Sequence, residues 1–118
     1  MSIDFQVKYS EQAAQDISDI IEYIGGVLCN PGAAERFYDE VNKKRQNIGK
    51  NPYMYPLSRD EKLNAEGYRV VVIRNYLLFY VVDEADMVVY IARIVYGKRN
   101  LAEVIEGDCS PLRGLNDS

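Results

Sequence analysis

The longest apolar pattern of the chain lies between Gly67 and Asn100, and short polar stretches interrupt it twice. The first interruption is Arg74-Asn75, and the second is the acidic stretch at residues 83–86. Each apolar run is about eight residues long and rich in Val, Ile, Tyr and Phe, which is typical of β-strands. The pattern therefore predicts three strands joined by two tight turns, an antiparallel meander.

Residues 3–9 alternate apolar and polar side chains with a period of two, which predicts one further strand. An amphipathic helix of about four turns follows, with Ser10 as its N-cap and apolar residues at three- and four-residue spacing. On this pattern, we expect Asp16, Asp19 and Glu22 on the solvent side of the helix.

Asn30-Pro31 predicts the start of a second helix, because Asn is a favoured cap and Pro is favoured at the first helical position. Its predicted buried stripe consists of Ala34, Phe37, Tyr38, Val41 and Ile48. Gly49 and Pro52 are expected to end it. Residues 50–66 show no clear periodicity and predict a loop with one helical turn.

The predicted order is β-α-α-β-β-β, which belongs to the α+β class. The first strand must pair within the sheet, because a lone strand leaves its backbone groups without partners. We expect a helix hairpin packed on one face of a mostly antiparallel four-stranded sheet, with the opposite face left open. A single domain is predicted over residues 1–105, and residues 106–118 are predicted to form a flexible tail.

The formal net charge is −4 and the isoelectric point is about 4.8, which argues against indiscriminate coating of nucleic acid. Residues 67–99 carry five bases and three acids, so a local basic surface on the sheet is still compatible with the charge. No apolar run approaches the ~18 residues of a membrane span, and the N-terminus lacks the pattern of a secretory signal. With Cys29 and Cys109 expected to be reduced, the predicted location is the cytoplasm.

Histidine is absent, which excludes imidazole-based triads and metal sites, and no phosphate loop or paired-cysteine motif is present. No metal and no cofactor are therefore predicted. The remaining candidates for chemistry are basic and aromatic residues of the meander: Arg69, Arg74, Arg93 and Tyr96, followed by Lys98 and Arg99.

Two interpretations of these candidates are open. The arginines either end strands and pair with nearby acids, or form an anion-binding surface suited to a phosphodiester. Tyr96 is either a half-buried strand residue, or a general acid or base, or a stacking platform for a nucleotide base. Strict alternation along the last strand puts Ile94 and Tyr96 on one face and Ile91 and Arg93 on the other, so it does not bring all the candidates together.

Several segments resemble the RelE/ParE superfamily of bacterial toxins, in the order in which that family has them. They are FQVKYSEQAAQDISDIIEYI, NPYMYPLSRDEK and YRVVVIRNYLLFYVVDEADMVVYIARIVYGKRN, and the resemblance covers about residues 3–104. The resemblance implies the toxin of a two-gene plasmid-stabilisation module, held inactive in a complex with a cognate antitoxin. The family fold is the one that the pattern predicts.

Two branches of the superfamily lead to different functions. RIVYGKRN is similar to ParE-like members, which poison DNA gyrase without being enzymes. RelE-like members cut mRNA on the ribosome, and the resemblance then implies that the catalytic residues are Arg69, Arg74, Arg93 and Tyr96. Arg74, Arg93, Tyr96, Lys98 and Arg99 are the implied contacts to target or antitoxin.

One departure from the RelE-like pattern lies in the loop before the meander. Its basic residues, Arg59 and Lys62, are interleaved with acids, and this favours the ParE-like branch. A third alternative is a degenerate member that only binds an antitoxin. Whether the chain is an enzyme depends on which of these branches it follows.

Overall fold

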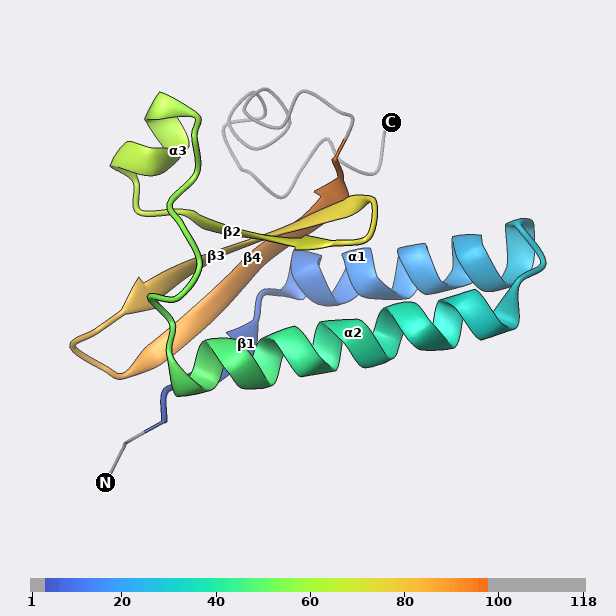
Figure 1. The fold of residues 1–118 in the computed structure, drawn as a ribbon, viewed down its shortest axis with the longest axis horizontal. Coiled ribbons are helices and arrows are strands. Elements are labelled where there is room, and N and C mark those ends of the chain that lie inside the picture. Colours follow the sequence, from blue (N-terminus) through green and yellow to red (C-terminus); the bar gives the residue numbers. More distant parts are fainter. Residues whose placement is uncertain (1–3, 98–118) are drawn as a thin grey trace.

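The molecule has two layers, a pair of helices lying across one face of a β-sheet (Figure 1). The structure is a computed structural model and describes residues 4–97. Its elements, in chain order, are β1 (Gln6–Tyr9), α1 (Glu11–Glu22), the π-helix η1 (Tyr23–Val27), α2 (Pro31–Lys50), α3 (Glu61–Ala65), β2 (Arg69–Ile73), β3 (Tyr76–Asp83) and β4 (Val88–Tyr96). The predicted α+β order is confirmed, and so is the single helical turn in the loop before the meander.

The four strands form one sheet with the order β1-β4-β3-β2. β2, β3 and β4 pair antiparallel as predicted, and β1 pairs parallel with β4. β1 and β2 are therefore the two edges of the sheet. Because the hairpin of α1, η1 and α2 connects these edges, it has to cross the whole face that it covers.

The helices α1 and α2 begin at the N-caps that the sequence predicts, Ser10 and Asn30. The Ser10 Oγ accepts a hydrogen bond from the Ala13 amide at 2.9 Å, and the Asn30 Oδ1 accepts one from the Ala33 amide at 3.1 Å. Each cap satisfies an amide that has no partner within the first turn of the helix. The starts of both long helices are thus set by local side-chain chemistry.

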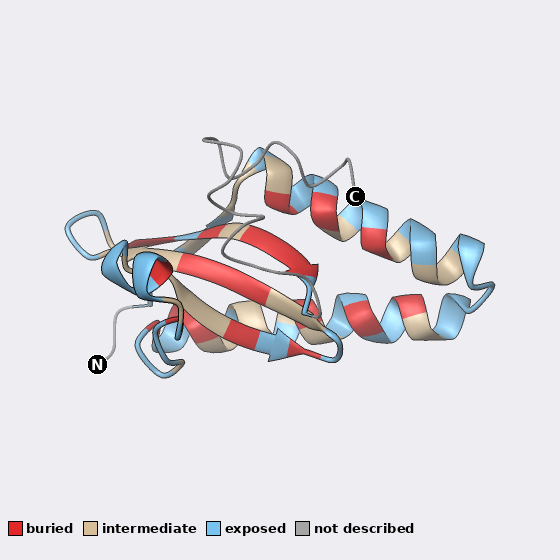
Figure 2. Ribbon diagram, turned by 90° about the horizontal axis from the view of Figure 1, so that it is seen from above, coloured by how far each residue is buried: buried red, intermediate tan, exposed pale blue. Residues whose placement is uncertain are grey.

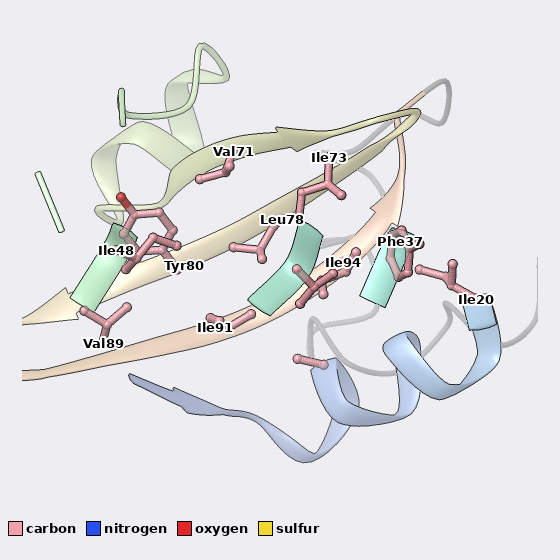
Figure 3. Packing of buried hydrophobic residues seen from close by; sticks show 12 residues of the cluster. Ile20, Phe37, Ile48, Val71, Ile73, Leu78, Tyr80, Val89, Ile91 and Ile94 are labelled. Carbon is pink, nitrogen blue, oxygen red and sulfur yellow. The ribbon is translucent and has the colours of Figure 1, made fainter. Parts of the chain in front are cut away.

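The main core lies between the hairpin and the sheet (Figure 3). Phe37, Val41 and Ile48 of α2 are fully buried there, against strand residues such as Leu78 and Ile91. The prediction that Tyr38 belongs to the buried stripe is wrong, because this residue is 48% exposed. Tyr38 lies one position past Phe37, and the 100° step of the helix turns it away from the sheet.

A β-bulge interrupts the pairing of β3 with β4. Phe79 pairs with Arg93 and Tyr80 pairs with Ile91, so Ala92 is the additional residue on β4. Ile91 and Ile94 consequently both belong to the core beneath the helices. The expected strict alternation, which placed them on opposite faces, is wrong at this point.

The face of the sheet opposite the helices was expected to be open, and this is also wrong. Leu63 of α3, Phe79 and Val95 are buried as a second apolar cluster. Tyr68, Val70 and Leu77 pack against them. Figure 2 shows buried stretches on the strands of the sheet and on the helices.

Several predictions fall on the chain ends. The boundary of the predicted domain at residue 105 and the predicted tail at residues 106–118 lie outside the described residues. Within residues 4–97, no helix combines the length and the apolar character that crossing a bilayer requires.

Candidate functional site

Two of the candidate residues, Arg74 and Tyr96, come together at one end of the sheet. Arg74 and Asn75 form the turn between β2 and β3, and Tyr96 ends β4. The register places Tyr76 opposite Tyr96, and the Gly97 amide donates to the Asn75 carbonyl at 2.8 Å. We call these residues, Arg74, Asn75, Tyr76 and Tyr96, the turn-end site.

Aromatic contacts hold this site against the hairpin. The rings of Tyr76 and Tyr96 meet edge to face with centroids 5.8 Å apart, and Tyr76 meets Phe37 of α2 at 5.3 Å. Burial raises the pKa of Tyr76, and the neighbouring Tyr23 and Tyr96 add to this. Tyr96 is 39% exposed at the rim of the site.

Arg74 has an unusual backbone conformation and an acidic partner. Its φ is +55°, in the left-handed region where a residue with a Cβ is strained. Its Nε lies 3.2 Å from the Glu40 Oε1 of α2, and its side chain is 48% exposed. The turn thus presents a guanidinium at the surface with part of its charge balanced by Glu40.

Arg69 lies at the opposite end of β2, roughly 16 Å from Arg74 by the rise of a strand. Its Nη1 donates to the Tyr55 carbonyl at 2.7 Å, and its guanidinium lies 5.1 Å from the centre of the Tyr53 ring. Arg69 anchors the loop before α3 to the sheet. The turn-end site does not include it.

Arg93 is fully buried and forms an ion pair with Asp16 of α1. Its Nε donates to the Asp16 Oδ2 at 2.8 Å and its Nη2 to the Oδ1 at 2.9 Å. The Ile94 amide donates to the same carboxylate at 3.0 Å. Asp16 was expected on the solvent side of its helix, and this is wrong: it is 6% exposed.

Asp16 provides hydrogen bonding to the edge of β4 that β1 provides along the earlier part of the strand. β1 stops at Tyr9, beside Ile91, so the following part of β4 has no neighbouring strand on that side. The Ser10 hydroxyl donates to the Ala92 carbonyl at 2.9 Å, and the Asp16 carboxylate accepts from the Ile94 amide. The side chains of Ser10, the N-cap of α1, and Asp16 thus continue the hydrogen bonding of this strand edge.

Of the predicted site residues, the structure therefore groups Arg74 and Tyr96 and separates Arg69 and Arg93 from them. Lys98 and Arg99 lie outside the described residues. Among residues 4–97, no group of three or more potential metal ligands is close enough together to hold an ion. What the turn-end site offers is an exposed guanidinium beside phenol groups, a combination that binds carboxylate or phosphate groups of a partner.

Three residues that shape this region were missed from the sequence. Asp16 had a signal, because it shares the three- and four-residue spacing of the buried Ala13 and Ile20. Tyr76 also had one, since it directly follows the predicted turn. Glu40 had none, because its approach to Arg74 depends on how α2 lies over the sheet.

The family model for the ParE toxin of the type II toxin–antitoxin system parDE matches residues 7–101. The chain belongs to the ParE toxin family. The match includes every element of the turn-end site together with both helices of the hairpin.

Solved structures of toxin–antitoxin proteins share the fold of this chain. The chromosomal ParDE toxin–antitoxin system of P. aeruginosa matches with a TM-score of 0.63 and 18% identity, covering 80% of this chain and 98% of that one. The RelBE2 complex of Mycobacterium tuberculosis has a TM-score of 0.55 at 18% identity, covering 80% and 99%. The intact E. coli RelBE complex has a TM-score of 0.53 at 16% identity, also covering 80% and 99%.

At these identities the solved structures speak for the fold alone. A comparison with the curated proteins gives no significant match. The family places the chain as the toxin of a type II toxin–antitoxin system. The target of the toxin is a separate question.

Proposed function

We propose that this chain is a growth-inhibitory toxin that acts by binding DNA gyrase rather than by catalysing a reaction. The observation that carries the proposal is the separation of the arginines. Arg93 is buried against Asp16 and Arg69 is bonded to the loop before α3, so of these three arginines only Arg74 reaches the surface at the turn-end site. A binding surface needs no more than this, whereas RNA cleavage needs several groups around one phosphate.

The ParE family model supports the same choice, since the chain matches it over residues 7–101. We further propose that a cognate antitoxin neutralises the toxin in a hetero-oligomer, as in the ParDE and RelBE complexes whose fold it shares. The plasmid-stabilisation role and a cytoplasmic location go with this proposal. The proposed contacts to gyrase or antitoxin are Arg74, Tyr96, Lys98 and Arg99. Arg93 is proposed to support these contacts indirectly, from its buried position in the ion pair with Asp16.

A supercoiling assay with purified gyrase tests the proposal. We expect the toxin to inhibit supercoiling and to trap the cleaved DNA–gyrase complex. Arg74→Ala should weaken inhibition by about 10-fold, because a charge-assisted contact contributes about 1.5 kcal/mol or more. Supercoiling that proceeds unchanged at a large excess of toxin would overturn it.

A matched control separates the loss of a contact from the loss of the fold. Arg59→Ala removes another exposed arginine, which lies in the loop before the meander and far from the turn-end site in the sequence. We expect this variant to inhibit gyrase like the wild type. Both variants should unfold at urea concentrations close to that of the wild type.

The alternative function, ribosome-dependent cleavage of mRNA, is favoured by one observation. Arg74 and Tyr96 lie at the same end of the sheet and are both exposed. Primer extension on translating mRNA tests it, and cuts that disappear in Arg74→Ala and Tyr96→Phe would establish it. A degenerate member, the third alternative, would leave growth unchanged when the toxin is expressed without its antitoxin.

A further inference from the structure

The helix hairpin extends past the end of the sheet at which the turn-end site lies (Figure 1). Three buried residues of α1, Ala13, Asp16 and Ile20, follow one another at three- and four-residue spacing. The Asp16 carboxylate reaches the Ile94 amide near the end of β4. The next position with this spacing is Tyr23, the first residue of η1, about 10 Å beyond Asp16 by the rise of a helix. Tyr23 therefore lies where the hairpin leaves the sheet.

Tyr23 is a neighbour of the phenols of the turn-end site. Ile20, one turn before Tyr23, belongs to the same buried cluster as Phe37 (Figure 3), and Phe37 meets the ring of Tyr76 with centroids 5.3 Å apart. Burial raises the pKa of Tyr76, and electrostatic interactions with Tyr23 and Tyr96 raise it further. Because such interactions weaken with distance, Tyr23 and Tyr96 both lie near Tyr76. We call Tyr23, Tyr76 and Tyr96, which come from η1, β3 and β4, the phenol cluster.

The phenol cluster has hydrogen-bonding groups at the surface. Tyr23 is 48% exposed, Tyr96 is exposed beside it, and η1 contains no buried residue. Within residues 4–97, the hydroxyls of the cluster form no hydrogen bond with another described residue. Each phenol can donate one hydrogen bond, and the exposed guanidinium of Arg74 adds further donors. The cluster and Arg74 together suit a ligand that is rich in acceptor oxygens.

We propose that Tyr23 is a further contact residue for the protein partner of this toxin, and that Tyr23, Tyr96 and Arg74 together hold an acidic segment of that partner. The guanidinium pairs with a carboxylate of the segment, and the two exposed phenols donate to its carboxylate and carbonyl oxygens. Tyr76 is a positioning residue, since its half-buried ring meets that of Tyr96 at 5.8 Å. The proposal rests on the proposed function, in which the partner is gyrase, and adds a residue and the chemistry of the contact.

The composition of this surface favours a protein over a nucleic acid. Tyrosine and arginine are enriched among the residues that contribute most to binding at protein interfaces, because a tyrosine combines a large, rigid contact area with a polar end. A phosphate backbone is bound by several basic groups at once. Here Glu40 offsets part of the charge of Arg74, with its Oε1 3.2 Å from the Nε. A single carboxylate of a protein fits that balance.

The affinity of the labelled toxin for purified gyrase tests the contact. Tyr23→Ala should weaken binding about 10-fold, as the loss of an aromatic residue at the centre of an interface does. Tyr23→Phe keeps the ring, removes only the hydroxyl and should weaken binding about 5-fold. Tyr90→Ala and Tyr90→Phe are the matched controls, because Tyr90 lies earlier on β4 and is 39% exposed, like Tyr96. Both controls should bind like the wild type, and urea unfolding shows that each variant is folded.

A variant of Glu40 tests the charge of the bound group. Glu40→Gln removes the acid that shares Arg74 and keeps the size of the side chain. Because the carboxylate of the partner then has Arg74 to itself, this variant should bind gyrase about 3-fold more tightly. Equal or weaker binding by Glu40→Gln would show that Arg74 does not meet an acidic group and would overturn the proposal.

The outcomes separate this proposal from the proposed function. Gyrase that binds the wild type and Tyr23→Ala equally well overturns the contact at Tyr23 and leaves the proposed function in place. If gyrase does not bind the wild type, the proposed function fails, and growth arrest on expression without antitoxin becomes the readout. Relief of the arrest by Tyr23→Ala but not by Tyr90→Ala, with no cuts in mRNA, then supports the contact to a protein. Arrest that persists in Tyr23→Ala, mRNA cuts that disappear in it, or a wild type that neither binds gyrase nor arrests growth would overturn the proposal.

Discussion

The Asp16 carboxylate accepts four hydrogen bonds. It accepts two hydrogen bonds from the Arg93 guanidinium, one from the Ile94 amide and one from the Gln12 side chain at 3.2 Å. A buried charge pair is costly to bring out of water, and it is tolerated when each lone pair finds a donor. Asp16 meets that condition, and in doing so it fixes α1 to the edge of β4.

Asp16→Ala should therefore destabilise the protein strongly. The substitution leaves the buried guanidinium without its carboxylate and removes the acceptor of the Ile94 amide, at a cost of about 3–5 kcal/mol. Urea unfolding measures the difference. Asp19→Ala, three residues further along the exposed side of α1, should change stability by no more than about 0.5 kcal/mol. A loss in Asp16→Ala no larger than that in Asp19→Ala would show that the pair does not stabilise the fold.

Tyr80 couples the stability of the fold to alkaline pH. Its buried hydroxyl donates to the Pro52 carbonyl at 2.6 Å, and burial raises its pKa to about 12. Because the unfolded chain releases this proton near pH 10, the contribution of Tyr80 is complete below pH 10 and is lost as the pH rises towards 12. Tyr80→Phe should lower stability at pH 7 by about 1 kcal/mol and should flatten the fall in stability between pH 10 and 12. Parallel pH profiles for the two proteins would contradict this assignment.

Ser10 connects three elements. It directly follows β1, caps α1 and forms a hydrogen bond with β4. Its hydroxyl accepts from the Ala13 amide and donates to the Ala92 carbonyl beside the bulge. Ser10→Ala should cost about 1–2 kcal/mol, the upper part of the range for an N-cap, because a strand contact is lost with the cap. Ser18→Ala, in the middle of the same helix and exposed, is the matched control. Equal unfolding midpoints for the two variants would argue that this connection is not needed.

The elements themselves follow from local sequence signals. A few consecutive residues are enough to predict the two caps, the period of two in the strands and the turn at Arg74-Asn75. These features were predictable because neighbours in the chain determine them. That the first strand pairs within the sheet was also expected, since a lone strand leaves backbone groups without partners, but its partner β4 was not predicted.

The bulge at Ala92 and the burial of Asp16 were not predicted, because both arise between elements. The bulge lets Ile91 and Ile94 face the helices together, and this advantage exists only once the hairpin lies on the sheet. Arg93 was a candidate for binding because it is a strand arginine in a basic segment. Only its partner on α1, 77 residues away, gives it a structural role.

At the scale of the whole molecule, α2 links the turn-end site to the far part of the hairpin. Glu40 of α2 pairs with Arg74 at the end of the sheet. Earlier on the same helix, Ala34, Glu35 and Tyr38 line an apolar hollow together with Ile21 of α1. The position of Arg74 at the surface therefore depends on how α2 lies over the sheet.

The overall charge of the chain leads to a prediction about whether the toxin binds DNA directly. With a net charge of −4, the chain lacks the excess of basic groups that binds the phosphate backbone without regard to sequence. At about 150 mM salt, we expect the purified chain alone to leave a 30-base-pair duplex unshifted in a gel, even at micromolar concentration. Adding gyrase should bring toxin and DNA into one complex, because the enzyme then supplies the DNA contacts. A shift of the duplex by the toxin alone, weakened by salt and by Arg74→Ala, would instead place DNA itself at the turn-end site and would overturn the proposed route through gyrase.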